Sequence, residues 1–425
     1  MSEKQNSEGQ SRREFLLSCF GAASCQDLIR AKGVESDPFP WDLRREWLRS
    51  RFPELRRHFV FEYYPWYAND PFYHWQQWGR VPPADLAGSS MPLLGAYDSR
   101  SVSVLEQHAR WITESGVGVV NLSWWGPGSY TDRVASVVMD VMHAHDLKVT
   151  FHLEPYSSER TEHLLTDVRY LLRNYGDRRN WDCLYLNRRV DGTEAPVFKL
   201  FATTMPSHTE DCHGVTREVS GYVSDDRWRW ATDRVRQEFL STFPNLVLLS
   251  GDSWNAPRGK ASGFDGVANY DPTTDTSRWL DAALEASRLG MVFSFNVSPG
   301  LDYISRRNVE ARECYTPPLF VPAAPGLDWS LAEDRERAAR LAADRVSETF
   351  KYNLWLQTHP WFFNAQLGFF LTYITSFNEW HEGTQFEPMR NPADFTAEER
   401  TVGYHNPRDG FYRLRLLTEL IGRLI

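Results

Sequence analysis

The sequence lacks long hydrophobic runs and an excess of basic residues. Its 425 residues are 42% hydrophobic and 24% charged. This balance is typical of a globular protein and excludes a disordered, collagen-like or multi-pass membrane protein. The net charge of −9 argues against a general nucleic-acid binder, which needs a basic face to displace phosphate counterions. We therefore expect no nucleic-acid partner and no integral membrane span.

Several cofactor-binding and catalytic motifs are also missing. The sequence has no HExxH, no P-loop and no GxGxxG, and no GxSxG elbow. The pair His152-x-Glu154 lacks the Pro-Cys-x-x-Cys partner of zinc deaminases. Nucleotide, zinc and serine-hydrolase chemistry are therefore without support, and we expect neither a cofactor nor a metal.

Cysteine is scarce, with five residues in the chain. Cys19 and Cys25 lie near the N-terminus, which leaves Cys183, Cys212 and Cys314. These three are widely spaced and odd in number, so no disulfide framework can be read from the sequence.

The N-terminal segment has the pattern of an export signal. Arg12 and Arg13 precede a short apolar run over residues 15–25, as in a twin-arginine (Tat) leader. This pattern predicts export to the periplasm or cell envelope, and the sequence before Cys25 is a weak lipoprotein-type site that makes Cys25 a candidate lipid anchor. The alternative is a frayed amphipathic helix. We assign residues 1–35 to the leader and a disordered segment, and residues 36–425 to one catalytic domain.

From about residue 58 onward, short apolar segments alternate with helical ones. The candidate strands are rich in Val, Phe and Leu and apolar on both faces, as buried parallel strands are; they span residues 58–64, 117–123, 147–153, 197–202, 245–250, 264–269, 291–297 and 370–376. Helical spacing of apolar residues marks residues 101–115, 131–145, 277–289, 331–350 and 412–425. Eight strands with helices between them predict an α/β fold, a single (β/α)8 TIM barrel. Residues 203–232 and 315–350 exceed a minimal barrel and are interpreted as loop elaborations, and residues 26–57 as an extension packed on the barrel.

Aromatic and acidic residues follow the predicted strands. In a barrel the functional site lies at the carboxyl ends of the strands, so these side chains should share one rim. Aromatic faces stack on sugar rings and carboxylates accept hydroxyl protons, which predicts a carbohydrate site. The candidate residues are Tyr64, Trp66, Trp125, His152, Glu154, Tyr270, Glu379, Trp380, His381 and Glu382.

Glu379 and Glu382 form the sharpest pair, because glycoside hydrolysis needs two carboxyl groups in different protonation states. Residues three apart on an extended strand face opposite sides. The pair therefore requires a turn after the eighth strand, which Gly383 permits. The alternative is a helix N-terminus whose acids favour the helix dipole alone.

Glu154 follows a buried strand, where a carboxylate is rarely placed for packing. It could bind a sugar hydroxyl or act as a third acid. His152 lies two residues away on the same face, and for it a hydrogen-bonded core histidine is the alternative.

The chain resembles glycoside hydrolase family 99, the endo-α-mannosidases and endo-α-1,2-mannanases. The resemblance rests on motifs that run in the family's order: YYPWY (63–67), SVSVLEQHARW (101–111), SWWGP (123–127), KVTFHLEPY (148–156), SGFDGVANY (262–270) and SFNEWHEGTQ (376–385). It implies a single (β/α)8 barrel that cleaves internal α-mannosidic bonds with retention, acting on α-mannan or a related oligosaccharide.

The resemblance also implies residue roles. Glu379 would be the base that takes the proton of the substrate's 2-hydroxyl, which then attacks the anomeric carbon to give a 1,2-anhydro sugar. Glu382 would be the general acid that protonates the leaving oxygen and then activates water. Glu154 and Tyr270 are similar to residues that contact the sugar. Trp125 suggests mannose rather than glucose on the non-reducing side.

Two other functions stay open at this point. One is a related barrel hydrolase acting on another α-linked polysaccharide, since residues 203–232 and 315–350 differ from the family pattern. The other is a non-catalytic glycan-binding barrel.

Overall fold

Eight parallel strands form the centre of the protein. The computed structural model describes residues 39–251, 254–310, 313–317 and 319–425. The strands are β1 (Phe59–Tyr63), β4 (Val119–Trp124), β5 (Lys148–Leu153), β7 (Glu194–Leu200), β10 (Val247–Ser250), β11 (Gly266–Ala268), β12 (Val292–Ser294) and β13 (Thr372–Ile374).

The strands are ordered β12-β11-β10-β7-β5-β4-β1-β13, and all neighbours along this path are parallel. A parallel bridge between Val297 and Ile374 joins the two ends of the sheet. This arrangement confirms the predicted (β/α)8 barrel, and each of the eight predicted strands is present. Every residue of β1, β4, β10, β11, β12 and β13 is buried, because both faces of a barrel strand are covered.

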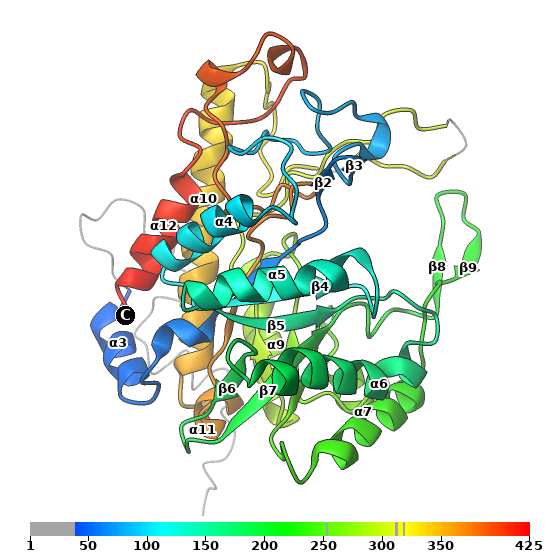
Figure 1. The fold of residues 1–425 in the computed structure, drawn as a ribbon, viewed down its shortest axis with the longest axis vertical. Helices are drawn as coiled ribbons and strands as arrows, with labels where there is room; N and C mark the ends of the chain where they lie inside the picture. The colour runs from blue at the N-terminus through cyan, green and yellow to red at the C-terminus, as the bar shows by residue number, and fades with distance from the viewer. Residues whose placement is uncertain (1–38, 252–253, 311–312, 318) are drawn as a thin grey trace, which may run out of the picture.

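Helices surround the barrel (Figure 1). They are α3 (Trp41–Arg49), α4 (Val102–Glu114), α5 (Tyr130–Ala144), α6 (Arg160–Leu171), α7 (Asp225–Phe239), α8 (Ala256–Ala261), α9 (Trp279–Arg288), α10 (Ala332–Thr358), α11 (Phe363–Leu367) and α12 (Tyr412–Gly422). The Ser129 hydroxyl caps α5 by accepting the backbone N–H of Asp132. Helix α10 is longer than the predicted 331–350, because its second half buries Phe350, Leu354 and Leu356 in the core.

The N-terminal extension packs on the barrel as far as the structure describes it. Trp41 and Leu48 of α3 join the main core, and the Arg44 guanidinium donates to the Thr358 hydroxyl at 3.2 Å. The predicted leader, residues 1–35, lies outside the described residues, as does Cys25. Within the described ranges, no helix combines the length and the apolar character needed to cross a membrane.

Additional short strands decorate the barrel. Strand β6 (Leu186–Arg188) pairs antiparallel with β7. Two hairpins are formed by β2 (Ala68–Asn69) with β3 (Phe72–Tyr73) and by β8 (His208–Glu210) with β9 (Thr216–Glu218). The β8–β9 hairpin belongs to the 203–232 elaboration and projects from the body of the protein (Figure 1).

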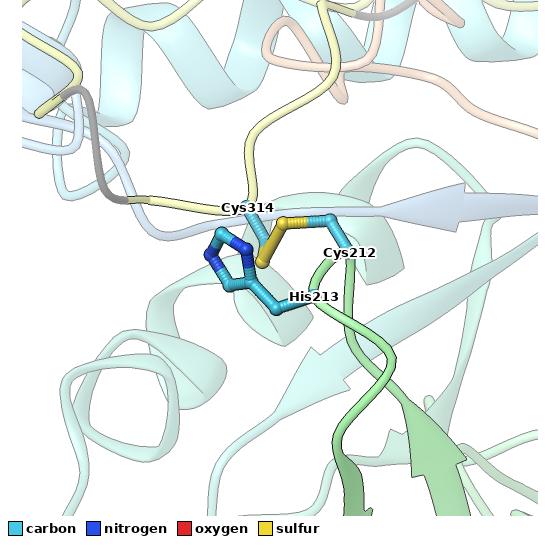
Figure 2. Close-up of side chains that lie close together, drawn as sticks. All are labelled: Cys212, His213 and Cys314. Atoms are coloured by element: carbon cyan, nitrogen blue, oxygen red, sulfur yellow. A yellow bond between two sulfur atoms is a disulfide. The ribbon is translucent and has the colours of Figure 1, made fainter.

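A disulfide joins two of these outer segments, and the cysteine spacing in the sequence did not reveal it. Cys212, at the end of the β8–β9 hairpin, is bonded to Cys314 in the segment after β12 (Figure 2). The two cysteines are 102 residues apart, and only the barrel fold brings their loops together. His213 lies beside them, but both sulfur atoms are used in the disulfide, so the three side chains do not form a metal site.

Candidate active site

After the last barrel strand, Glu382 lies in a turn and Glu379 directly precedes it. Residues 380–383 form this turn, and Gly383 has a φ of 68°. A Cβ atom at Gly383 would lie 2.5 Å from the Asp302 carbonyl oxygen, so only glycine fits. The turn excludes the helix N-terminus as an explanation for the acid pair.

Neighbouring backbone fixes the turn. The N–H of Asp302 donates to the Glu382 carbonyl and the N–H of Ile304 to the His381 carbonyl, both at 2.8 Å. The buried Arg413 guanidinium donates to the Gly383 and Gln385 carbonyls at 2.8 and 2.7 Å. The acids are therefore presented by a rigid segment.

Burial and neighbouring charge set the protonation of the two acids. Burial and the neighbouring Glu382 carboxylate raise the pKa of Glu379 well above its ordinary value. Burial raises the pKa of Glu382 to about 7. Two carboxyl groups that interact in a poorly solvated site resist double ionisation. At neutral pH the pair therefore holds a proton, as acid–base catalysis by two carboxyls requires.

Each acid has a specific hydrogen-bond donor. The Tyr270 hydroxyl donates to Glu382 Oε2 at 2.6 Å, and burial together with the Glu382 charge raises the pKa of Tyr270 well above its ordinary value. The backbone N–H of His381 donates to Glu379 Oε1 at 3.0 Å. Tyr270 comes from the loop after β11, so the structure brings together residues from two distant segments, as the sequence predicts.

Glu154 lies at the end of β5 and is buried. The Ser123 hydroxyl donates to Glu154 Oε1 at 2.8 Å and accepts the indole N–H of Trp125 at 3.2 Å. Burial raises the pKa of Glu154, while His152 and Ser123 oppose the rise. Trp125 is 37% exposed, so its ring is accessible to a ligand.

The aromatic residues after β1 lie near Tyr270. The rings of Tyr64 and Trp66 are 4.8 Å apart, and those of Tyr64 and Tyr270 are 6.4 Å apart. The Asn378 amide clamps Tyr64, since its Oδ1 accepts the Tyr64 N–H at 2.7 Å and its Nδ2 donates to the Tyr64 carbonyl at 3.0 Å. Trp66 is partly exposed.

Two further candidates, Trp380 and His381, are held by buried neighbours of the turn. Trp380 is fully buried and donates its indole N–H to Glu387 Oε2 at 2.9 Å. His381 is buried, stacks on His74 and has a pKa that burial lowers to about 3. Both side chains are packed against their neighbours, and their contact with substrate stays a prediction.

Three charged residues that hold the site were missed by sequence reasoning. Glu387 accepts hydrogen bonds from Trp380, Tyr97 and His108. Glu62 and Lys199 form a fully buried ion pair beside His152. The available signal was a single charged residue inside an otherwise apolar strand, in FVFEY and in VFKL.

Comparisons with known proteins agree on one family. The profile of glycosyl hydrolase family 99 matches residues 56–204. The glycoprotein endo-α-1,2-mannosidase of Mus musculus is 27% identical over 358 residues, which cover 76% of this chain and 66% of the mouse protein. The Xenopus laevis glycoprotein endo-α-1,2-mannosidase is 25% identical, covering 82% of this chain and 74% of the frog protein. The chain thus spans about two thirds of the length of the mouse relative.

A solved structure supports the same fold. The GH99 endo-α-mannosidase from Bacteroides thetaiotaomicron superposes with a TM-score of 0.57 at 20% identity, covering 87% of this chain and 97% of that one. The chain therefore shares its barrel architecture with the Bacteroides thetaiotaomicron enzyme.

Proposed function

We propose that the chain is an endo-acting glycoside hydrolase that cleaves internal α-mannosidic linkages with retention of configuration, because the glycosyl hydrolase family 99 profile matches residues 56–204 and endo-α-1,2-mannosidases are similar to most of the chain. Its substrate is an α-mannan or a related oligosaccharide with α-1,2 linkages. The observation that carries the proposal is the buried pair of Glu379 and Glu382, of which Glu382 accepts a hydrogen bond from the Tyr270 hydroxyl.

The first step forms a 1,2-anhydro sugar. Glu379, as the carboxylate, takes the proton of the 2-hydroxyl of the reacting mannose. The 2-oxygen attacks the anomeric carbon from the face opposite the leaving oxygen, while Glu382 gives its proton to that oxygen. In an α-mannoside the axial 2-hydroxyl lies trans to the leaving group, which permits this attack.

The second step restores the mannose. Glu382, now ionised, takes a proton from water, whose oxygen attacks the anomeric carbon and opens the three-membered ring. The 2-oxygen recovers its proton from Glu379. Two inversions at the anomeric carbon give net retention, and both acids return to their starting states.

The neighbouring residues have supporting roles. Glu154 accepts a hydroxyl of the sugar at the cleavage point, and Trp125 stacks on the sugar on the non-reducing side, where a mannose fits. Tyr64 and Trp66 form an aromatic wall beside the acids. Tyr270 orients Glu382 through its hydroxyl.

The test is digestion of a defined α-1,2-mannan oligosaccharide by the wild type, Glu379→Gln and Glu382→Gln, with Glu398→Gln as the surface control since Glu398 is exposed. We expect each site variant to lose about 10²–10⁴-fold in kcat and the control to match the wild type. Early NMR of the product should show the α-anomer first. Near wild-type activity of either site variant, or a β-anomer as first product, contradicts the roles.

The disulfide-linked hairpin after β7 favours a second candidate, cleavage of another α-linked polysaccharide, because it adds surface outside the barrel. Digestion of a panel of α-linked glycans separates the two. Activity confined to a non-mannan member of the panel would support the second candidate.

We also propose that the protein is exported through its twin-arginine segment. The Cys212–Cys314 disulfide supports this, because disulfides persist in oxidising compartments such as the periplasm. Fusion of residues 1–38 to a reporter that is active only after export tests the proposal, with Arg12→Lys/Arg13→Lys as the export-defective control. Incorporation of labelled lipid by the wild type but not by Cys25→Ala tests the lipid anchor.

A further inference from the structure

An ion pair lies inside the barrel below the acid turn. Lys199 Nζ of β7 is 2.5 Å from Glu62 Oε1 of β1, and both side chains are fully buried. Strands β5 and β4 separate β7 from β1 in the sheet, so the pair spans the barrel interior. Burying two charges has a desolvation cost that their attraction only partly offsets. Apolar side chains of similar volume would fill the same space without that cost, so packing alone does not explain the pair.

The pair is extended by two further side chains. Glu62 Oε2 accepts the Asn121 amide at 2.9 Å and lies 3.3 Å from His152 Nδ1. The strand register places Glu62 beside Asn121 and His152 beside Lys199. Although burial alone would raise it, the Lys199 ammonium and the His152 ring lower the pKa of Glu62 to about 2. Glu62 is therefore a carboxylate that can only accept hydrogen bonds.

The carboxylate determines how the His152 ring is used. Because the Glu62 carboxylate faces Nδ1, it favours the tautomer with the hydrogen on Nδ1, and in that tautomer Nε2 is an acceptor. The His152 side chain is 2% exposed, and neither of its ring nitrogens has a hydrogen-bond partner of good geometry among the described residues. Nδ1 lies 3.3 Å from the Glu62 carboxylate, which leaves Nε2 as the nitrogen open to a ligand. A buried acceptor of this kind is costly unless a ligand satisfies it.

The network also touches the acid pair. The His152 ring lies 6.4 Å from the ring of Tyr270, and Lys199 Nζ lies 5.5 Å from the centre of the same ring. Tyr270 in turn donates to Glu382. The ion pair thus contacts two side chains that line the reacting position.

We propose that Lys199 and Glu62 are a positioning pair, which holds His152 with Nδ1–H toward Glu62 and presents Nε2 as the acceptor for a hydroxyl of the bound sugar. Lys199 keeps Glu62 ionised in the barrel interior, and Glu62 orients the ring. Neither residue touches the substrate. The role in catalysis rests on the proposed function, whereas the orientation of His152 does not.

The test compares the wild type with the double variant Glu62→Gln/Lys199→Met, which removes both charges and leaves no buried charge unpaired. Lys260→Met is the control, since Lys260 is exposed on α8. Three quantities are measured: the midpoint of denaturant unfolding, kcat and KM on the α-1,2-mannan oligosaccharide, and the 15N NMR shifts of His152 in histidine-labelled protein, assigned with His152→Gln.

We expect the double variant to fold, to raise KM by about 10-fold or more because one hydrogen bond to the sugar is lost, and to lose the Nδ1–H signature of His152. A double variant that keeps the wild-type KM and the wild-type His152 signature would show that the pair serves stability alone. If the double variant does not fold, KM and the His152 NMR shifts are measured instead in Glu62→Gln, whose amide oxygen still accepts from Lys199.

Failure of the proposed function is distinguishable from failure of this inference. A wild-type protein that cleaves no α-mannan contradicts the function, while the NMR comparison still decides whether Glu62 and Lys199 orient His152.

Discussion

Removal of one hydroxyl should move the pH range in which the enzyme is active. The Tyr270 hydroxyl donates to Glu382 Oε2 at 2.6 Å and thereby stabilises the ionised carboxylate. Burial raises the pKa of Glu382 to about 7, and the Tyr270 bond limits that rise. Tyr270→Phe should therefore raise the pKa further. A hydrogen bond to a charged group contributes about 1.5–3 kcal/mol, so even the lower value corresponds to about one pKa unit.

The sign of the effect follows from the proposed role of Glu382. A general acid must be protonated, so activity is present below its pKa and is lost as pH rises through it. The alkaline limb of kcat/KM, which reports the free enzyme, should move from about pH 7 in the wild type to about pH 8 in Tyr270→Phe, with a lower maximum because Glu382 is less well oriented. The measurement is kcat/KM against pH between 5 and 9 on a short α-1,2-mannan oligosaccharide.

Tyr303→Phe is the matched control. Burial and the two acids raise the pKa of Tyr303 to about 12, so it senses the same charges, but within the described part of the chain it makes no hydrogen bond to Glu382. Its pH profile should match the wild type. An alkaline limb that stays at pH 7 in Tyr270→Phe, or moves to lower pH, would refute Glu382 as the general acid held by Tyr270.

Three other perturbations test separate parts of the structure. Glu382→Gln should equal the wild type in free energy of unfolding near pH 4 and exceed it by up to about 3 kcal/mol at pH 8. The reason is that the pKa of Glu382 is raised from 4.5 to about 7 on folding, so the folded wild type loses stability as pH rises between those values. Urea unfolding at both pH values measures the difference, and equal stability of the two proteins at pH 8 would contradict it. Cys212→Ser/Cys314→Ser should lower the unfolding free energy by up to about 4.7 kcal/mol, since the disulfide closes a loop of 102 residues. Unfolding of the oxidised and the reduced wild type provides the comparison. A wild-type unfolding free energy that does not change with reductant would argue against the bond. Trp125→Ala should raise KM about 10-fold with a smaller change in kcat. Trp125 is 37% exposed, and its ring is proposed to stack on a sugar that does not carry the reacting carbon. An unchanged KM would show that Trp125 does not bind the substrate.

The barrel was predictable because its strands carry a local signal. Segments such as FVFEY and VVNLSW are short, apolar and buried on both faces, a pattern that parallel strands produce. Helix α7 has a weaker signal, because its buried Trp228, Ala231 and Val235 are interspersed with arginines and aspartates. The disulfide has no local signal at all, since Cys212 and Cys314 meet only through the fold.

The acid pair was predictable for a different reason. Two glutamates three apart are useful together only on a turn, and Gly383 next to them supplies the positive φ. What the sequence does not reveal is which neighbours face outward. Trp380 adjoins Glu379 in the chain yet is fully buried against Glu387. Glu62 and Lys199 appear as isolated charges in apolar strands, and only the register places them together.

The charge state of the free site bears on substrate choice. Burial raises the pKa of both acids, so the pair keeps a proton at neutral pH. The proposed first step needs that proton on Glu382. A sugar hydroxyl that donates to Glu379 stabilises the ionised form of Glu379 and thereby favours the proton on Glu382. On this mechanism an axial 2-hydroxyl has two functions: it is the attacking group, and it favours the protonation state that the attack requires. A glycan without that hydroxyl in reach of Glu379 would bind to the aromatic rim without supplying either function.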